Sequence, residues 1–141
     1  MSGLEALSLA CNVFQTISFA RDTVNFCRDV YNGQKTPDAH LEAQATAMIQ
    51  AAQQVESSCS SSTLTASERT LVDISRQCVT TAKKLEAMVQ SITKTQRKGK
   101  FVSALSTRLK SLWKQKDIES LDKALLRYTN TMQVLLIDRI W

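Results

Sequence analysis

Glycine and proline are scarce in this 141-residue sequence, which contains three glycines and one proline. Both residues disfavour helix interiors, so their scarcity removes most of the signals that would end a helix early. Hydrophobic residues make up 43% of the chain, which supplies enough apolar side chains for a core. We therefore expect one all-α domain over residues 1–141, an antiparallel bundle of four to five helices with a long first helix.

Residues typical of catalytic and metal sites are also scarce. His40 is the only histidine, and we expect it to be exposed near the start of a helix. The acidic residues are scattered singly, and Asp22, Asp29, Asp73 and Asp122 are interpreted as surface charges. This pattern contains no converging set of metal ligands and no nucleophile beside a base. The sequence therefore predicts a protein that is not an enzyme and that holds no metal or cofactor.

Four cysteines lie at wide spacings without a CxxC pair: Cys11, Cys27, Cys59 and Cys78. This pattern favours small buried hydrophobic residues over a metal or redox site, with disulfides or a reactive thiol as the alternatives. No basic residue precedes the first apolar stretch, which argues against a secretory signal. We therefore expect a cytoplasmic protein.

Charge is absent from fifteen consecutive residues near the amino terminus, Ala6 to Ala20. Ser2 and Glu5 form a capping-box pattern that starts a helix at Gly3, and Asn32-Gly33 is a typical helix stop. Such a helix can be a core helix, a membrane-entering helix or an interface helix. Fifteen residues span about 22 Å, whereas the hydrocarbon core of a bilayer is about 30 Å thick. Membrane entry would therefore require oligomerisation, whereas core packing requires nothing further.

Two more helices follow from caps and apolar spacing. The second begins at Thr36-Pro37, where a capping residue precedes a proline at the first helical position, and it frays at residues 57–62. Thr65 and Glu68 form a capping box that begins a third helix, with apolar residues on one side as far as Ile92. The short connections imply that neighbouring helices are antiparallel.

The last third of the chain predicts a loop and two helices. Residues 94–100 form the loop, and Phe101 to Trp113 form an amphipathic helix. Asp117 is expected to cap a final helix, whose apolar pattern runs to Trp141 without a stop signal. We therefore expect the natural polypeptide to continue beyond this residue.

Acidic residues are missing from residues 94–116, which carry a net charge of +8. Residues 1–92, in contrast, contain seven basic and nine acidic residues. A solvated charged face, an anionic membrane surface and a calmodulin-like partner all fit such a segment. Nucleic acid fits less well, because no recognition motif accompanies the charge. The candidate residues for anionic lipid are Lys94, Arg97, Lys98, Lys100, Arg108, Lys110, Lys114 and Lys116.

Several stretches are similar to a known group of domains. They are the opening residues 1–20, Tyr31-Asn-Gly, Leu71-Val-Asp-Ile and the terminal Leu135-Leu-Ile-Asp-Arg-Ile-Trp. With them the chain resembles the HeLo-like and SesA-like amino-terminal domains of fungal STAND receptors, which are similar to NOD-like receptors. The resemblance implies an effector domain ahead of a NACHT or related nucleotide-binding module. It also implies regulated cell death by membrane damage when that module releases or clusters the domain.

The uncharged helix and the basic segment suggest how such an effector would work. The nucleotide-binding module would cluster several copies of the first helix, and this module lies elsewhere because the sequence has no P-loop motif. The basic segment would hold the copies against anionic lipid as the protein moves from the cytoplasm to the plasma membrane. The expected partners are a second copy, anionic lipids and the nucleotide-binding module of the same receptor, and not nucleic acid. The candidates for membrane insertion are Leu4, Leu7, Val13, Phe14 and Ile17.

Two other functions fit the same sequence. The bundle could act as a non-lytic adaptor that binds a downstream protein or another copy of itself. It could also be an inhibitory domain that folds back onto the nucleotide-binding module.

Overall fold

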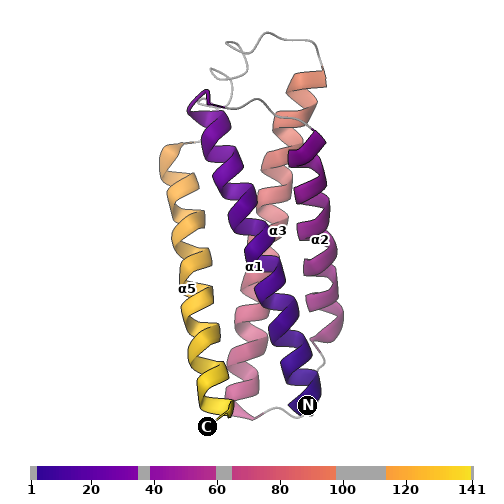
Figure 1. Ribbon diagram of the computed structural model, residues 1–141, viewed down its shortest axis with the longest axis vertical. Coiled ribbons are helices and arrows are strands. Elements are labelled where there is room, and N and C mark those ends of the chain that lie inside the picture. Colours follow the sequence, from indigo (N-terminus) through magenta and orange to yellow (C-terminus); the bar gives the residue numbers. More distant parts are fainter. Residues whose placement is uncertain (1–2, 35–38, 60–64, 98–113, 141) are drawn as a thin grey trace.

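The computed structural model describes residues 3–34, 39–59, 65–97 and 114–140 of the chain. Four helices occupy these ranges: α1 (Gly3–Tyr31), α2 (Ala39–Ser58), α3 (Ala66–Arg97) and α5 (Gln115–Ile140). They lie side by side along one long axis, and each runs antiparallel to the helix before it in this order (Figure 1). The predicted all-α bundle with a long first helix is therefore confirmed. The amphipathic helix predicted from Phe101 to Trp113 lies outside the described residues.

The first helix, α1, packs against α2, α3 and α5, and its contacts with α2 are the most extensive between any two of the described helices. One side of α1 is buried from Ala6 to Val30 at steps of three and four residues, as expected for a helix with one apolar face. This side includes Leu9, Val13 and Val24, which are fully buried. The other helices contribute the fully buried Leu41, Met48, Leu85, Leu125 and Met132. The uncharged segment is therefore a core helix in this fold.

The carboxyl end of α1 is closed by the predicted Asn32-Gly33 stop. Gly33 has a φ of 74°, a left-handed backbone conformation that glycine adopts without strain. Its amide donates to the carbonyl of Val30 at 3.1 Å, and the amide of Gln34 donates to the carbonyl of Asp29 at 2.8 Å. These two bonds form a Schellman motif, which satisfies carbonyls that the end of the helix would otherwise leave open.

The third helix, α3, begins as predicted and ends later than predicted. The amide of Glu68 donates to the side-chain oxygen of Thr65 at 3.2 Å, so the predicted amino-terminal cap is confirmed. The loop predicted over residues 94–100 is wrong for its first four residues, because α3 continues to Arg97. The physical reason is that no glycine or proline occurs between Pro37 and Gly99, so neither residue type disfavours a further helical turn over residues 94–97.

The last helix, α5, begins at Gln115, two residues before the predicted cap. The amide of Lys114 donates to Oδ2 of Asp117 at 3.3 Å, and the amide of Asp117 donates to the carbonyl of Lys114 at 2.9 Å. Asp117 thus reaches back from the first turn to the residue that precedes the helix, as the acidic member of a capping box does. The prediction that Asp117 is the capping residue is therefore wrong, because it lies within the first turn and supports the cap from there.

The cysteines differ in burial and form three groups. Cys27 and Cys78 are buried in the core, and burial raises the pKa of each thiol to about 12, so both are the small hydrophobic residues that were predicted. Cys59, just after α2, is partly buried, and burial raises the pKa of its thiol despite the nearby Arg76. Cys11 is exposed, which corrects its predicted burial. It lies on the outer side of α1, next in sequence to Ala10 on the buried side.

Candidate interaction surface

Both chain termini lie at one end of the bundle (Figure 1), and large apolar side chains near them are exposed. Leu4 and Leu7 in the first turns of α1 are 81% and 51% exposed, and Val134 and Ile137 near the end of α5 are 58% and 56% exposed. We call these four residues the end patch. Single exposed apolar residues are common, but several at one end of a small domain indicate a contact surface. The end patch is therefore the candidate interaction surface.

An apolar cavity opens at the same end of the bundle, between α1, α3 and α5. Its volume is about 370 Å³. It is lined by Gly3, Ala6, Leu7 and Ala10 from α1, Ser67 and Leu71 from α3, and Met132, Leu135 and Leu136 from α5. None of these side chains is charged, and the small residues of α1 leave the space that larger side chains would fill. The cavity suits an apolar group and offers nothing to stabilise an ion.

The structure separates the five predicted insertion residues. Leu4 and Leu7 lie together on the exposed side of α1, and Phe14 is partly buried. Val13 and Ile17 lie in the core. Their contact with lipid would require α1 to leave its three neighbours, whereas Leu4 and Leu7 are accessible in the folded bundle. Within the residues that the structure describes, no helix combines the length and the apolar character needed to cross a bilayer.

Polar side chains buried along α1 are satisfied within the helix itself. Thr16 and Thr23 are fully buried, and their hydroxyls donate to the carbonyls of Asn12 at 2.8 Å and Phe19 at 2.7 Å. These bonds do not depend on neighbouring helices, so they would survive if α1 moved into another apolar environment.

The described members of the predicted lipid-binding set lie at the other end of the bundle. Lys94 and Arg97 belong to the last turns of α3, and Lys114 and Lys116 are exposed at the start of α5. Because α5 contains 26 residues, its two ends are about 39 Å apart at 1.5 Å per residue. Four predicted lipid-binding residues lie outside the described part of the chain, namely Lys98, Lys100, Arg108 and Lys110. The sequence predicts antiparallel helices, but this prediction was not applied to place the leucines and the basic residues at opposite ends of the bundle.

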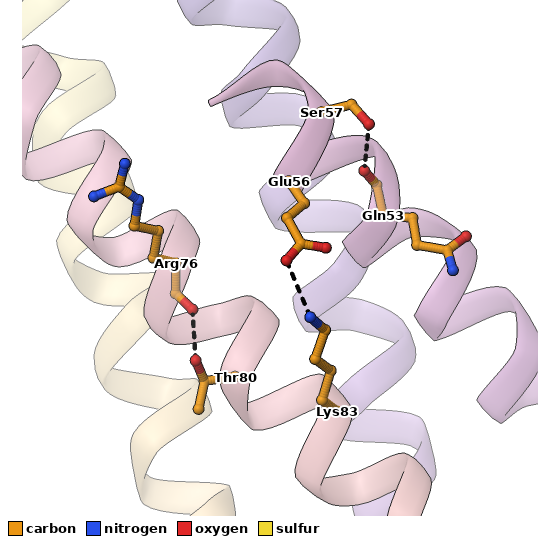
Figure 2. A network of polar contacts seen from close by, with 6 residues as sticks. All are labelled: Gln53, Glu56, Ser57, Arg76, Thr80 and Lys83. Atoms are coloured by element: carbon orange, nitrogen blue, oxygen red, sulfur yellow. Dashed lines mark hydrogen bonds and ion pairs between the residues drawn. The ribbon is translucent and has the colours of Figure 1, made fainter. Parts of the chain in front are cut away.

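Polar contacts on the other surfaces link neighbouring helices. Glu56 of α2 accepts from Lys83 of α3 at 3.0 Å (Figure 2), and Arg28 of α1 lies 3.3 Å from Asp122 of α5. All four side chains are more than one-third exposed, so each pair contributes at most about 1 kcal/mol to stability. These pairs tie helices together and form no pocket for a ligand.

The residue types typical of catalytic and metal sites lie apart from one another in the described part of the chain. His40 is exposed, as predicted, and its ring lies 6.1 Å from that of Phe26 between centroids. The described residues contain no group of three or more histidine, cysteine or acidic side chains placed to hold a metal ion. The end patch and its cavity remain the surface with the clearest capacity for binding.

Comparison with protein families gives a match over most of the chain. The model of the family described as SesA, the N-terminal domain on NACHT_NTPase and P-loop NTPases, matches residues 13–132. No curated protein and no solved structure matches the chain. The matched range covers most of the chain, whereas all four residues of the end patch lie outside it.

Proposed function

The chain belongs to the SesA family, the N-terminal domains on NACHT and P-loop NTPases, and from this premise we propose that it is the effector and oligomerisation domain of a NACHT-type receptor. The nucleotide-binding module of the same receptor clusters several copies of the domain. The clustered copies then act on a membrane and cause regulated cell death, as in fungal STAND receptors. The domain works from the cytoplasm and moves to the plasma membrane when it is activated.

The observation that carries this proposal is the exposure of Leu4 and Leu7 at the start of a helix without charge from Ala6 to Ala20. Moving one leucine side chain from water into an apolar medium is favourable by about 1.5–3 kcal/mol. A single copy therefore gains little from two leucines, whereas several clustered copies add their contributions at one membrane site. Clustering is thus the step that makes the contact with lipid stable.

Deeper insertion requires a change in the bundle. Val13 and Ile17 are buried against other helices, so they reach lipid only when α1 separates from the core. Contact through Leu4 and Leu7 comes first in this sequence of events, and release of the rest of α1 follows. The separation of α1 is the step that makes damage depend on activation.

The basic residues restrict how the folded bundle meets the membrane. Lys114 and Lys116 are exposed at the end opposite the end patch, and each basic residue near an anionic leaflet contributes about 1 kcal/mol. A bundle whose long axis stands upright on the membrane can place only one of its ends, and so only the leucines or only the lysines, in contact with lipid. The folded domain therefore lies along the surface when lysines and leucines bind together.

Dye leakage from liposomes tests the proposal. Residues 1–141 are fused to an inducible dimerisation module and mixed with vesicles that contain phosphatidylserine. Clustering of the wild-type chain is expected to release the dye, and Leu4→Asp with Leu7→Asp is expected to reduce the release at least fivefold. Leu126→Asp is the matched control, because this leucine is 49% exposed but lies outside the end patch. Equal leakage from the end-patch variant and the control would contradict the assignment of these leucines.

The cavity favours a second candidate function, a non-lytic adaptor that binds another protein through an apolar side chain. In that case clustering releases no dye, and the end-patch substitutions still disrupt binding of the partner. Comparing leakage and binding in the same set of variants therefore separates the two functions.

A further inference from the structure

The last helix, α5, is buried unevenly along its length. Its first half contributes a regular stripe to the core, formed by Ile118, Leu121, Leu125 and Tyr128. Within residues 129–137, which we call the α5 tail, Met132 is the only buried residue. Leu135 and Leu136 would continue the stripe, but they are only partly buried. Fewer buried side chains therefore hold the tail than hold the first half of the helix.

Unfilled space lies between the α5 tail and the first turns of α1. The lining of the cavity of about 370 Å³ includes the small residues Gly3, Ala6 and Ala10 from α1 and Met132, Leu135 and Leu136 from the tail. A side chain that faces empty space loses the contacts that atoms there would provide. Leu135 and Leu136 therefore gain less from packing than the residues of the first half of α5 gain.

Polar contacts anchor the first half of α5 to two of its neighbours. The buried hydroxyl of Tyr128 lies 3.2 Å from that of Thr81 on α3, and the carboxylate of Asp122 lies 3.3 Å from the guanidinium of Arg28 on α1. Both contacts lie on the amino-terminal side of the tail. They would stay in place if the tail alone moved away from the bundle.

We propose that the α5 tail is an autoinhibitory strap that lifts from α1 and α3 while the first half of α5 stays bound. Segments with few buried apolar contacts open before the rest of a fold, and a short helical end released into water is only marginally stable. Lifting uncovers Ala6 and Ala10 in the uncharged segment of α1, and it removes part of the packing that keeps this segment in the core. The autoinhibitory role rests on the proposed effector function, whereas the opening itself is a property of the isolated bundle.

Thiol labelling of residues 1–141 measures the opening without lipid. Cys11→Ser and Cys59→Ser remove the native thiols that are not fully buried, and Ala10→Cys places a reporter under the tail. The matched control is Ala20→Cys, because Ala20 is fully buried on the same helix and does not line the cavity. The reagent is a maleimide joined to a dye too bulky to enter the cavity, so that labelling requires the tail to lift. We expect Ala10→Cys to be labelled at least about tenfold faster than Ala20→Cys.

Two substitutions of the same kind, Met132→Ala and Met48→Ala, distinguish local opening from unfolding of the whole bundle. Both methionines are fully buried, but Met132 belongs to the tail and Met48 to α2. The lifted state has already lost the contacts of Met132 and keeps those of Met48. In the chain with Ala10→Cys, Met132→Ala is therefore expected to raise the labelling rate at least about tenfold, and Met48→Ala less than about threefold. If circular dichroism shows that Met132→Ala is unfolded, Leu135→Ala takes its place, with an expected rise of about threefold.

Equal acceleration by the two methionine substitutions would overturn the opening, because the reporter would then be reached only through unfolding of the whole bundle. Equal labelling of Ala10→Cys and Ala20→Cys would overturn it as well. Dye leakage by inducibly clustered chains tests the autoinhibitory role, and Met132→Ala is expected to release dye faster than both the wild type and Met48→Ala. Wild-type leakage without this difference would overturn the autoinhibitory role alone. Absence of leakage from every chain would overturn that role together with the effector function, and the labelling rates would still decide whether the tail opens.

Discussion

Two leucines five residues apart on α1 are expected to respond very differently to truncation. Leu9 is fully buried, whereas Leu4 is 81% exposed. Truncating Leu9 to alanine removes three buried carbons, worth about 2.4 kcal/mol at ~0.8 kcal/mol each. The cavity left behind adds to this loss, so we expect Leu9→Ala to lower the free energy of unfolding by about 3 kcal/mol. Leu4→Ala is expected to change it by less than about 0.5 kcal/mol.

Urea denaturation followed by circular dichroism measures both variants against the wild type. The dependence of the free energy of unfolding on urea concentration should be the same in all three, since the buried surface changes little. In thermal melts, Leu9→Ala should lower Tm by roughly 10 °C. A loss above about 1 kcal/mol for Leu4→Ala, or below about 1 kcal/mol for Leu9→Ala, would refute the assignment of the two sides of α1.

Three further substitutions or labels test other parts of the fold. Gly33→Ala is expected to lower the free energy of unfolding by about 1–2 kcal/mol, because the φ of 74° at this position strains any side chain. Gly3→Ala is the control and should leave the free energy of unfolding unchanged. Equal effects of the two substitutions in urea denaturation would contradict the helix stop at Gly33. Tyr128→Phe is expected to lower the free energy of unfolding by about 1 kcal/mol in the same assay, because the buried Tyr128 hydroxyl lies 3.2 Å from the hydroxyl of Thr81 on α3. An unchanged free energy of unfolding would contradict a stabilising hydrogen bond between these two hydroxyls. A thiol reagent at about pH 8 should label the exposed Cys11 and leave Cys27 of the folded protein unlabelled, because Cys27 is buried and its pKa of about 12 keeps its thiol protonated at pH 8. Peptide mass spectrometry that finds Cys27 labelled in the folded protein would contradict its burial.

Much of the fold could be predicted from the sequence, because local signals and packing agree. The stop at Gly33 and the cap at Thr65 are short-range patterns, and both are confirmed by their hydrogen bonds. The predicted loop after residue 93 was wrong at its start because clustered positive charge is not itself a helix breaker, and α3 continues to Arg97. Cys11 was misplaced because its residue type suggested burial although its position lies off the buried side of α1.

The candidate surface was harder to predict, because it depends on how separate helices meet. Apolar spacing grouped Leu4 with Val13, but the bundle buries Val13 and exposes Leu4 at its end. The cavity needs residues from α1, α3 and α5, and no local pattern connects them. The sequence of α5 did indicate an exposed apolar surface, because Val134 and Ile137 extend its apolar residues onto the side that faces away from the core.

Membrane damage in cells tests the effector function most directly. Residues 1–141 fused to an inducible dimerisation module are expressed in fungal cells, and uptake of a membrane-impermeant dye is followed after the inducer is added. We expect rapid uptake with the wild-type chain and with Leu126→Asp, and little uptake when Leu4 and Leu7 are both replaced by aspartate. Intact cells after clustering of the wild-type chain, or equal uptake with the double aspartate variant at equal expression, would contradict the proposed effector function.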